Sequence, residues 1–596
     1  MKISYYIVPL ALISGILSGC ASMTPAINEA SNITLVPDPA PIIPEESTSV
    51  ASKENLPNVE LTDEILFKVV SAEIAFQRAD FPAAFATMMA VAQQTRDPRL
   101  PKRAMEMALI AKQPLQAFIA SRLWHEYSPD SDEATQYYLG FMVINNNLAE
   151  VNTIISQRLA GATPKERGLI ILQTQRLVMR GTDKEASFKL LEELCKPYPD
   201  LLETHLALAQ AAYASNNSVR ALVEAHAAIM LSPNSQIAAL TLAQVSASPD
   251  AALKALADFL IQNPTAHEVR RAYAGMLIEQ KQFAQARSQF DILQAERPQD
   301  PAIMYTQGVL ALQMNDVVSA EKNLKDFVNE LEASSSEQRD PTSAYLYLSQ
   351  IADDRNDGVA ALDWLSKVQS YNGKNAAYFN AQLRTALLMA KYGQLDQARQ
   401  FLHELKASPE EQIEIIQLDA ELLRNAKRDA DAMSLLQEAT KSHPDNPDLL
   451  YDFAMMAEKF DRIDEMEKAL RQVIKINPEN QHAYNALGYS FADRNIRLPE
   501  ARALIEKALS LAPDDAFIID SMGWLEFREN QNEKALAFLQ RAYQIRPDVE
   551  IAVHVGEVLW SMGDQQKAKS IWKEAQQKDP SNAALKSTLE RLKVSL

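Results

Sequence analysis

Residues 513–547 read PDDAFIIDSMGWLEFRENQNEKALAFLQRAYQIRP, and this stretch decides the fold. A proline stands at each end, and the apolar residues between them recur at helical spacing. Gly523 and Ala535 are small residues placed where two packed helices would touch, and Ala542 is a third. The stretch therefore predicts a helix–turn–helix unit.

The same pattern recurs along the chain with a period near 34 residues. Prolines mark the units at positions 98, 129, 164, 199, 233, 264 and 298, and again at 409, 444, 478, 513, 547 and 580. Counted within a unit, position 8 is small, as in Ala209, Ala274, Ala420, Ala454, Gly488, Gly523 and Gly556. Position 20 is alanine at 117, 221, 286, 432, 501, 535 and 568, and position 27 is alanine at 228, 508, 542 and 575.

This pattern resembles the tetratricopeptide repeat (TPR). The resemblance implies an all-α fold, a right-handed superhelical solenoid of roughly 15 helix pairs in which each unit contacts only its neighbours. The scarcity of glycine, 15 in 596 residues, also favours helix. The last stretch, SNAALKSTLERLKVSL (581–596), predicts a polar-faced capping helix.

The repeat pattern weakens in the middle of the chain. Residues 299–372 lack the closing prolines and contain ELEASSSEQRD (330–340), which indicates a loop. We therefore expect an N-terminal array over 61–335 and a C-terminal array over 336–596, with a bend or break near 330–340.

The N-terminus is typical of an exported protein. Lys2 is followed by ISYYIVPLALISGIL (3–17), an uncharged run that is too short to span a membrane but suits a signal peptide over 1–19. Residues 17–20, LSGC, resemble the lipobox of bacterial lipoproteins. The resemblance implies cleavage between Gly19 and Cys20 and lipidation of Cys20. The alternative is an ordinary secretory signal that contains a cysteine.

The residue after Cys20 is Ala21, and in lipoproteins this favours the periplasmic face of the outer membrane of a Gram-negative cell. Residues 20–60, with six prolines, runs of serine, threonine and asparagine, and six acidic residues against one lysine, predict a disordered tether behind the lipid. The other cysteine, Cys195, lies at helical spacing in FKLLEELCKPYP, and we expect it to be a buried small apolar residue.

Composition and motifs argue against several functions. The net charge of −19 disfavours nucleic acid and anionic lipid head groups as partners. No two of the eight histidines lie within 20 residues, and the sequence contains no H-E-x-x-H, G-x-G-x-x-G or G-x-S-x-G motif. We therefore expect a protein-binding scaffold that is not an enzyme and has no metal or cofactor.

In the TPR family, positions 2, 5, 9, 12 and 13 line a concave groove that binds proteins. Near the C-terminus these positions fall on His482, Asn485, Tyr489 and Asp493, on Phe517, Asp520, Trp524, Phe527 and Arg528, and on Glu550, Val553, Glu557 and Trp560. Aromatic residues and arginine dominate the energetics of protein interfaces. Trp524 and Trp560 either line this groove or pack between repeats, whereas Trp572 is predicted to be core.

Five strings are similar to one family in particular: LTDEILFKVVSAEIAFQRADFPAAF (61–85), TRDPRLPKRAMEMAL (95–109), HAYNALGYSFADR (482–494), APDDAFIIDSMGW (512–524) and HVGEVLWSMGDQQKA (554–568). They resemble TPR outer-membrane lipoproteins of proteobacteria that act as adaptors of a periplasmic carboxyl-terminal processing protease. The resemblance implies a non-enzymatic adaptor that binds and activates this serine protease and brings it peptidoglycan hydrolases. The alternative is a TPR scaffold for envelope assembly or for polysaccharide or protein export machinery.

The lipobox interpretation gives a first prediction. Replacing Cys20 with alanine removes the lipidated sulfur, so we expect the protein to move from the membrane fraction to the soluble periplasmic fraction without unfolding. Cell fractionation followed by immunoblotting measures this. Retention of the Cys20→Ala variant in the membrane fraction would contradict the interpretation.

Overall fold

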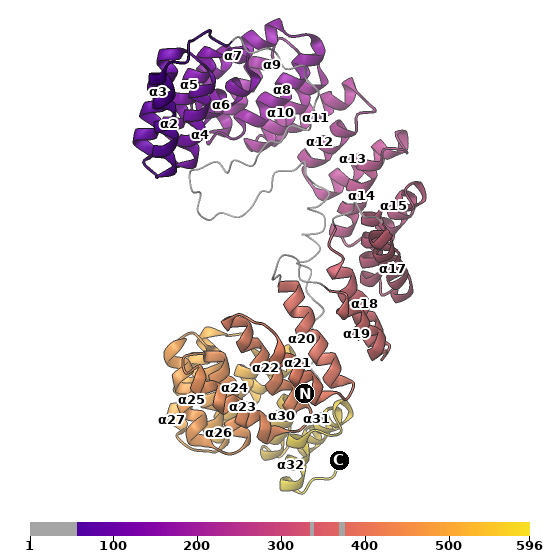
Figure 1. Ribbon diagram of the computed structural model, residues 1–596. Coiled ribbons are helices and arrows are strands. Elements are labelled where there is room, and N and C mark those ends of the chain that lie inside the picture. Colours follow the sequence, from indigo (N-terminus) through magenta and orange to yellow (C-terminus); the bar gives the residue numbers. More distant parts are fainter. Residues whose placement is uncertain (1–55, 334–338, 369–375) are drawn as a thin grey trace. The chain divides into compact units, whose positions relative to one another are not determined.

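The computed structural model describes residues 56–333, 339–368 and 376–596 (Figure 1). Within these ranges the chain forms thirty-one α-helices and no β-strand. The predicted signal peptide, Gly19, Cys20, most of the tether and the predicted boundary at 335/336 lie outside the described residues. The chain divides into two compact units between Asn323 and Leu324.

The first unit contains α2 (Asp63–Gln77), α3 (Phe81–Thr95), α4 (Arg99–Ile110), α5 (Pro114–Tyr127), α6 (Asp132–Ile144), α7 (Leu148–Gly161), α8 (Pro164–Val178), α9 (Lys184–Cys195), α10 (Leu202–Ala214), α11 (Ser218–Leu231), α12 (Gln236–Val245), α13 (Pro249–Gln262), α14 (His267–Glu279), α15 (Phe283–Glu296), α16 (Pro301–Gln313) and the start of α17 (Val317–Ala333).

The second unit contains the rest of α17, then α18 (Thr342–Asp354), α19 (Gly358–Ser366), α20 (Ala376–Lys391), α21 (Leu395–Glu404), α22 (Pro409–Asn425), α23 (Asp429–Ser442), α24 (Pro447–Lys459), α25 (Ile463–Ile476), α26 (Gln481–Asp493), α27 (Leu498–Leu511), α28 (Ala516–Arg528), α29 (Asn532–Ile545), α30 (Val549–Ser561), α31 (Gln565–Lys578) and α32 (Ala583–Leu592).

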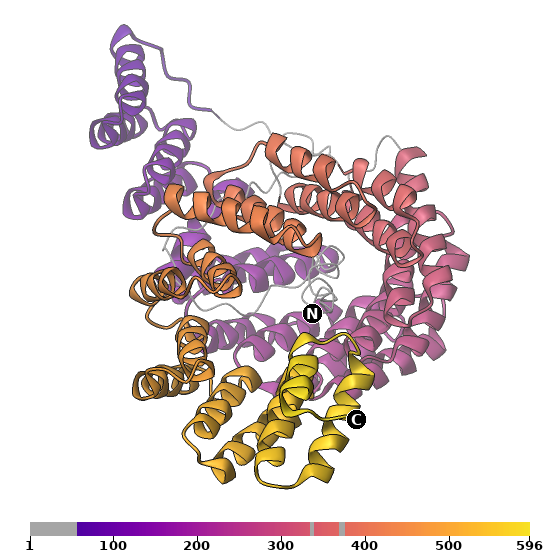
Figure 2. The same ribbon diagram turned by 90° about the horizontal axis from the view of Figure 1, so that it is seen from below.

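The helices pack as consecutive pairs, such as α24–α25, α26–α27 and α30–α31, which are labelled in Figure 1; Figure 2 shows the same ribbon from below. We call the even-numbered helix of each pair its A helix and the odd-numbered one its B helix. From α2 to α31 the described residues hold fifteen such pairs, and α32 follows as a single helix. The predicted all-α TPR architecture and its number of pairs are confirmed.

The small residues lie where the two helices of a pair meet. All the alanines that the sequence places at positions 8, 20 and 27 are at most 1% exposed. At Gly556 a Cβ atom would come within 2.2 Å of the indole Nε1 of Trp572, and at Gly523 within 2.6 Å of Leu539. These positions let the helices approach closely enough for large side chains to fill the spaces around them.

Prolines have two roles in the array. Pro444, Pro478, Pro513, Pro547 and Pro580 each stand two residues beyond the end of a B helix, where proline prevents the helix from continuing. Pro164 and Pro409, from the same periodic series, instead start α8 and α22. Both of these helices begin with a capping box, formed by Thr163 with Glu166 and by Ser408 with Glu411.

The turns inside the pairs explain why the chain needs so little glycine. The turn between A and B helices repeatedly contains one residue in the left-handed conformation, which usually favours glycine. Here glycine fills it only at Gly393 and Gly563 among the described residues. The others are Ala79, Lys112, Asn146, Asn216, Lys281, Asn315, Asn356, Lys427, Asp461, Asn495 and Asn530, with φ between 55° and 63°, and Arg497, a second such residue in the turn before α27, with φ 50°.

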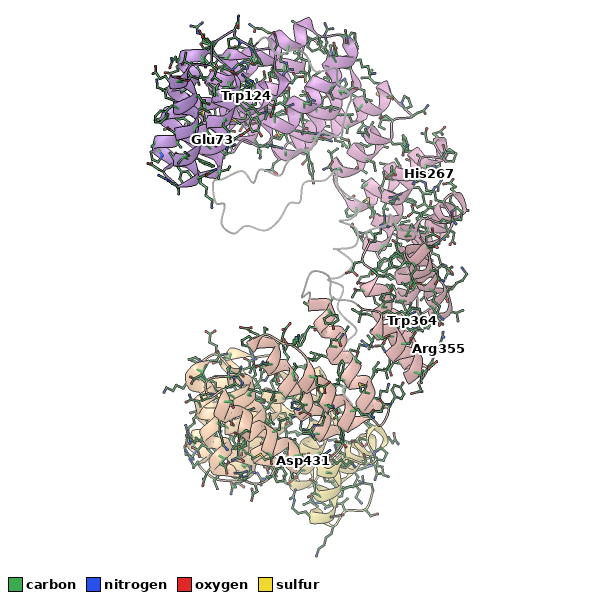
Figure 3. All side chains as sticks on the ribbon, in the orientation of Figure 1. Glu73, Trp124, His267, Arg355, Trp364 and Asp431 are labelled. Atoms are coloured by element: carbon green, nitrogen blue, oxygen red, sulfur yellow. The ribbon has the colours of Figure 1, made fainter. Side chains whose placement is uncertain are left out.

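Neighbouring pairs are also joined by side chains about one repeat apart. The Arg103 guanidinium of α4 contacts the carboxylate of Glu73 in α2 at 2.8 Å, and Arg471 reaches Glu500 at 2.5 Å. Figure 3 marks Glu73 together with Trp124, a buried residue of α5. Such pairs fix the register of one unit on the next.

Two further sequence interpretations concern the core. Cys195 is buried, and its burial raises the pKa of the thiol to about 12, as expected for an inert apolar residue. Trp572 is fully buried, and its Nε1–H donates to the carbonyl of Val553 at 3.2 Å. Both interpretations are confirmed.

None of the helices in the described residues is long and apolar enough to cross a membrane.

The close approach at Gly556 gives a second prediction. Gly556→Ala should lower the free energy of unfolding by about 1–3 kcal/mol, because the added methyl group must displace a rigid, buried indole. The matched control is Gly161→Ala in α7, where no neighbouring atom lies within 4 Å of the new Cβ. The control should be neutral or slightly stabilising. Denaturant unfolding measures both changes, and an equally stable Gly556→Ala protein would contradict the account.

Candidate partner-binding site

The predicted groove residues belong to three A helices, α26, α28 and α30, which pack in succession in the second unit. Helical periodicity places positions 5, 9 and 13 of each A helix on one side of that helix. The residues at equivalent positions are therefore neighbours in space although they are about 34 residues apart in the chain.

The centre of this surface is an aspartate–histidine pair that joins α28 to α30. His554 Nδ1 lies 2.9 and 3.0 Å from the two carboxylate oxygens of Asp520. The imidazole stacks on the indole of Trp524, with ring centroids 4.2 Å apart. Its Nε2 lies 3.5 Å from the hydroxyl of Tyr489 on α26. The imidazole of His554, on α30, thus contacts side chains of the other two A helices, α26 and α28.

Trp524 is enclosed by its neighbours. Its Nε1–H donates to Asp493 at 3.1 Å, and Phe527 packs against it with ring centroids 5.2 Å apart. The Arg528 guanidinium carbon lies 4.7 Å from the indole centroid, while Nη2 donates to the carbonyl of Asp493 at 2.7 Å. As a result Trp524 is only 3% exposed. We name Tyr489, Asp493, Asp520, Trp524, Phe527, Arg528 and His554 the Trp524 cluster.

The remaining groove candidates lie around this cluster. Phe517 is exposed beneath the guanidinium of Arg546, at 5.0 Å from the ring centroid. Glu557 accepts a hydrogen bond from Arg591 at 2.6 Å, and the half-buried Trp560 packs on Trp572. His482 and Glu550 are exposed, Asn485 is half-buried, and Val553 is buried.

The environment of the cluster shifts two pKa values. Burial lowers the pKa of His554, but the carboxylate of Asp520 outweighs it, so the pKa lies above its ordinary value. Glu557 and Asp493 act in the same direction. Burial, together with the carboxylates of Asp493 and Asp520, raises the pKa of Tyr489. His554 therefore takes up a proton more readily than a free histidine, and Tyr489 loses its proton less readily than a free tyrosine.

These properties suit binding. The cluster combines aromatic rings with paired charges, and exposed polar groups such as the Asp493 carboxylate surround the rings. In the described parts of the chain, no group of three or more histidine, cysteine, aspartate or glutamate side chains is arranged to hold a metal ion.

His554 is the member of the cluster that the sequence analysis did not select. It lies at repeat position 6, which is not one of the groove positions of the family. A signal was present, because His554 follows Asp520 by 34 residues, one repeat period. Searching for complementary residues one period apart would have found this pair and also Glu557 with Arg591.

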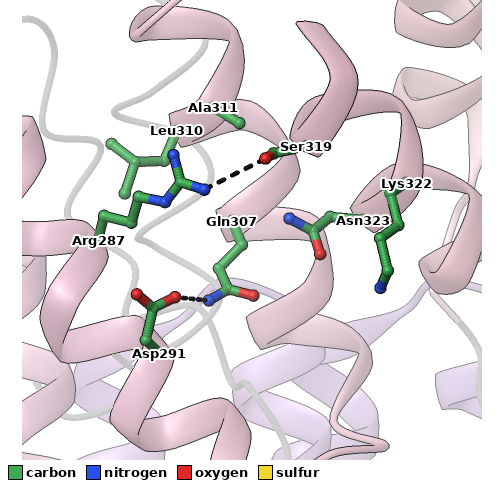
Figure 4. Close-up of a pocket in the computed structure, with 8 residues that line it drawn as sticks. All are labelled: Arg287, Asp291, Gln307, Leu310, Ala311, Ser319, Lys322 and Asn323. Carbon is green, nitrogen blue, oxygen red and sulfur yellow. Dashed lines mark hydrogen bonds between the residues drawn. The ribbon is translucent and has the colours of Figure 1, made fainter. Parts of the chain in front are cut away.

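The first unit contains a separate cavity of about 210 Å³ between α15, α16 and α17 (Figure 4). Its lining is polar, with Leu310 and Ala311 as the apolar part; the other lining residues are Arg287, Asp291, Gln307, Ser319, Lys322 and Asn323. Arg287 donates to Asp316 at 2.8 Å and to Ser319 at 3.2 Å, and Gln307 donates to Asp291 at 2.9 Å. These groups bond to one another, which is typical of a hydrated gap between repeats.

Comparison with known proteins agrees with the geometry. Residues 238–301 and 451–516 match the family model described as tetratricopeptide repeat. Over 216 residues the chain is 39% identical to the TPR repeat-containing protein PA4667 of Pseudomonas aeruginosa, which covers 36% of this chain. The match spans about a third (36%) of the length of that relative.

Two solved structures are similar to parts of the chain. A thermophilic TPR protein of Thermus thermophilus, TTC0263, has 20% identity and a TM-score of 0.27, covering 29% of this chain and 96% of that one. A tetratricopeptide repeat protein from Parabacteroides merdae has 16% identity and a TM-score of 0.34, covering 42% of this chain and 97% of that one.

The fold and its repeats define the class of protein: an interaction scaffold, of the kind that binds protein partners along stacked helices. More particularly, this chain is an all-α TPR solenoid with fifteen helix pairs among its described residues.

The Asp520–His554 pair gives a third prediction. The folded-state pKa of His554 is above that of an unfolded histidine, about 6.5. The pair therefore stabilises the fold fully below pH 6.5, and this contribution is lost as the pH rises through the raised pKa. Asp520→Asn should lower the pKa of His554 and reduce the loss of stability above pH 6.5.

NMR titration of the histidine ring protons, assigned with a His554→Gln variant, measures the pKa directly. Denaturant unfolding at several pH values from 6 upward measures the linked stability. An unchanged His554 titration in the Asp520→Asn protein would show that the carboxylate does not control this imidazole.

Proposed function

We propose that the chain is a non-enzymatic adaptor, anchored in the outer membrane and facing the periplasm. It binds and activates a carboxyl-terminal processing protease and presents peptidoglycan hydrolases to it as substrates. The observation that carries the proposal is the Trp524 cluster, because five of its seven residues lie within the strings that are similar to this adaptor family (482–494, 512–524 and 554–568).

The cluster supports binding because it is a rigid platform beside exposed groups. Trp524 is held by its ring contacts with His554 and by its hydrogen bond to Asp493, so the surface is ordered before a partner arrives. Preorganisation lowers the entropic cost of association. Phe517, about two helical turns before Trp524 on α28, remains accessible as an exposed aromatic ring, and Asp493 as an exposed carboxylate.

The LSGC motif supports the anchoring. Lipidation at Cys20 would restrict the scaffold to the membrane surface, and a tether over 20–60 would hold the array away from that surface. A scaffold that holds a protease and its substrate together raises their effective concentration, which strengthens a weak encounter by about two to four orders of magnitude. The scaffold needs no catalytic group of its own for this role.

A capture experiment tests the proposal. The mature protein is used to pull down partners from detergent-solubilised envelopes, and mass spectrometry identifies them. We expect a periplasmic serine protease of the carboxyl-terminal processing class together with cell-wall hydrolases. Capture of an export or assembly complex without a protease would move the function to an envelope-assembly scaffold.

The contribution of the site is measured with the purified protease. Phe517→Ala removes an exposed aromatic ring at the edge of the Trp524 cluster, so we expect it to weaken protease or substrate binding by at least about tenfold. Val359→Ala is the matched control, because it also removes an exposed apolar side chain from the second unit but lies on α19. Equal affinities of the two variants would show that this surface does not bind the partner.

A further inference from the structure

The first helix of the array has an apolar face that no described residue covers. In α2, Ile65 and Ala72 are buried against the following helices. On the other side Phe67, Val70 and Ile74 are 72%, 46% and 43% exposed, and Leu66 is exposed beside them. An apolar helix face is normally buried against another element. We call Leu66, Phe67, Val70 and Ile74 the α2 outer face.

The repeat register shows what this face is built to contact. Ala72 and Ala84 are fully or almost fully buried and stand twelve residues apart, so they occupy positions 8 and 20 of the first pair. Phe67, Val70 and Ile74 are then positions 3, 6 and 10. The residues at positions 3 and 10 of later A helices are Ile518 and Leu525 in α28 and Ile551 and Val558 in α30.

Those later equivalents are at most 1% exposed. The helix α28 packs against the preceding helices α26 and α27, and α30 packs against α28 and α29. Like them, α2 has its own B helix, α3, and a following pair. Within the part of the chain that the structure describes, the one neighbour that it lacks is a preceding helix pair. Its outer face therefore carries apolar residues at the positions that a preceding helix covers elsewhere in the chain.

The other end of the array does not show this feature. The helix α32 buries Leu585 and Thr588 and exposes Lys586, Ser587, Glu590 and Arg591. Terminal repeats of solenoids need such a polar outer face to remain soluble. The array is thus closed at its C-terminal end and open at its N-terminal end, within the residues that the structure describes.

We propose that the α2 outer face is a docking site for an amphipathic helix of a partner protein, which packs there as the missing preceding helix. Glu60 and Asp63 flank the N-terminal half of the face, and Glu64 beside them is paired with Lys68 at 2.5 Å. The flank therefore keeps a net negative charge, so the docking helix carries lysine or arginine beside its apolar stripe. This inference rests on the protein-binding class of the fold and not on the identity of the protease.

The alternatives fit the sequence less well. Prolines interrupt residues 21–55 at positions 25, 37, 39, 41 and 44, and the stretch after Pro44 is polar, so this part of the chain offers no long apolar helical stripe. The same acidic residues that attract a basic helix oppose contact with anionic lipid head groups. A helix from another protein satisfies both the shape and the charge of the site.

The test uses the mature chain in detergent and a fluorescein-labelled amphipathic peptide of leucine and lysine, about 18 residues long, so that it forms several helical turns. A scrambled peptide of the same composition is the peptide control. We expect the amphipathic peptide to bind, measured by fluorescence anisotropy, and Phe67→Gln with Val70→Gln to weaken it at least fivefold. The side chains are exposed, so the variant should keep its melting temperature.

Val219→Gln is the matched protein control, because Val219 is 78% exposed on α11 and should leave the affinity unchanged. Equal binding of the scrambled peptide, or unchanged binding by the α2 variant, would overturn the proposal. Three further results would also overturn it, because each identifies another occupant of the face. The first is self-association of the protein that the α2 variant abolishes. The second is flotation of the protein with phosphatidylethanolamine–phosphatidylglycerol vesicles, again abolished in the α2 variant, and the third is peptide binding that appears only after residues 21–55 are deleted.

These outcomes are independent of the protease adaptor role, which is decided by the capture experiment and by Phe517→Ala. A chain that captures the protease but fails to bind the peptide at α2 would retain the adaptor function without this second site.

Discussion

The close approach of two helices at a small residue is the constraint on which the rest of the structure depends. At Gly556 the backbone of α30 leaves room for the indole of Trp572 and for nothing more. The same contact, with alanine or glycine, recurs in most pairs and fixes the spacing between successive units. Once that spacing is set, residues about 34 positions apart become neighbours. Asp520 then meets His554, and Glu557 meets Arg591, without any local sequence signal.

The binding surface follows from this spacing of about 34 residues between neighbouring positions. Each A helix contributes a few side chains, and the surface exists only where three consecutive units place complementary groups at neighbouring positions. The Trp524 cluster needs Asp493 from one unit, Trp524 and Asp520 from the next and His554 from the third. A substitution in one unit therefore alters the contacts of two others, whereas most core substitutions in a solenoid act locally.

Much of the fold could be predicted from the sequence because the same helix–helix contact recurs in many repeats. The alanines at positions 8, 20 and 27, the core role of Trp572 and the buried Cys195 all followed from spacing. Three features did not. His554 lies outside the family's groove positions, so the groove register did not select it, although its spacing of 34 residues from Asp520 was a usable signal. The left-handed turns use residues such as Lys427 and Ala79, which give no turn signal in sequence. The exposure of Phe67 could not be read from an apolar helix pattern, which by itself predicts burial.

The unequal ends of the array also have a dynamic consequence. In a one-dimensional stack, the free energy needed to open a unit depends on the number of interfaces that it loses. Among the described residues, the pair α2–α3 has a neighbouring pair on one side only, whereas pairs such as α26–α27 and α28–α29 have one on each side. Amide hydrogens of α2 and α3 should therefore exchange with solvent sooner than those of α26 and α28, and opening should spread inward from that end. A helix that covers α2 would supply the second interface. Its binding would therefore slow amide hydrogen exchange several helices away from α2.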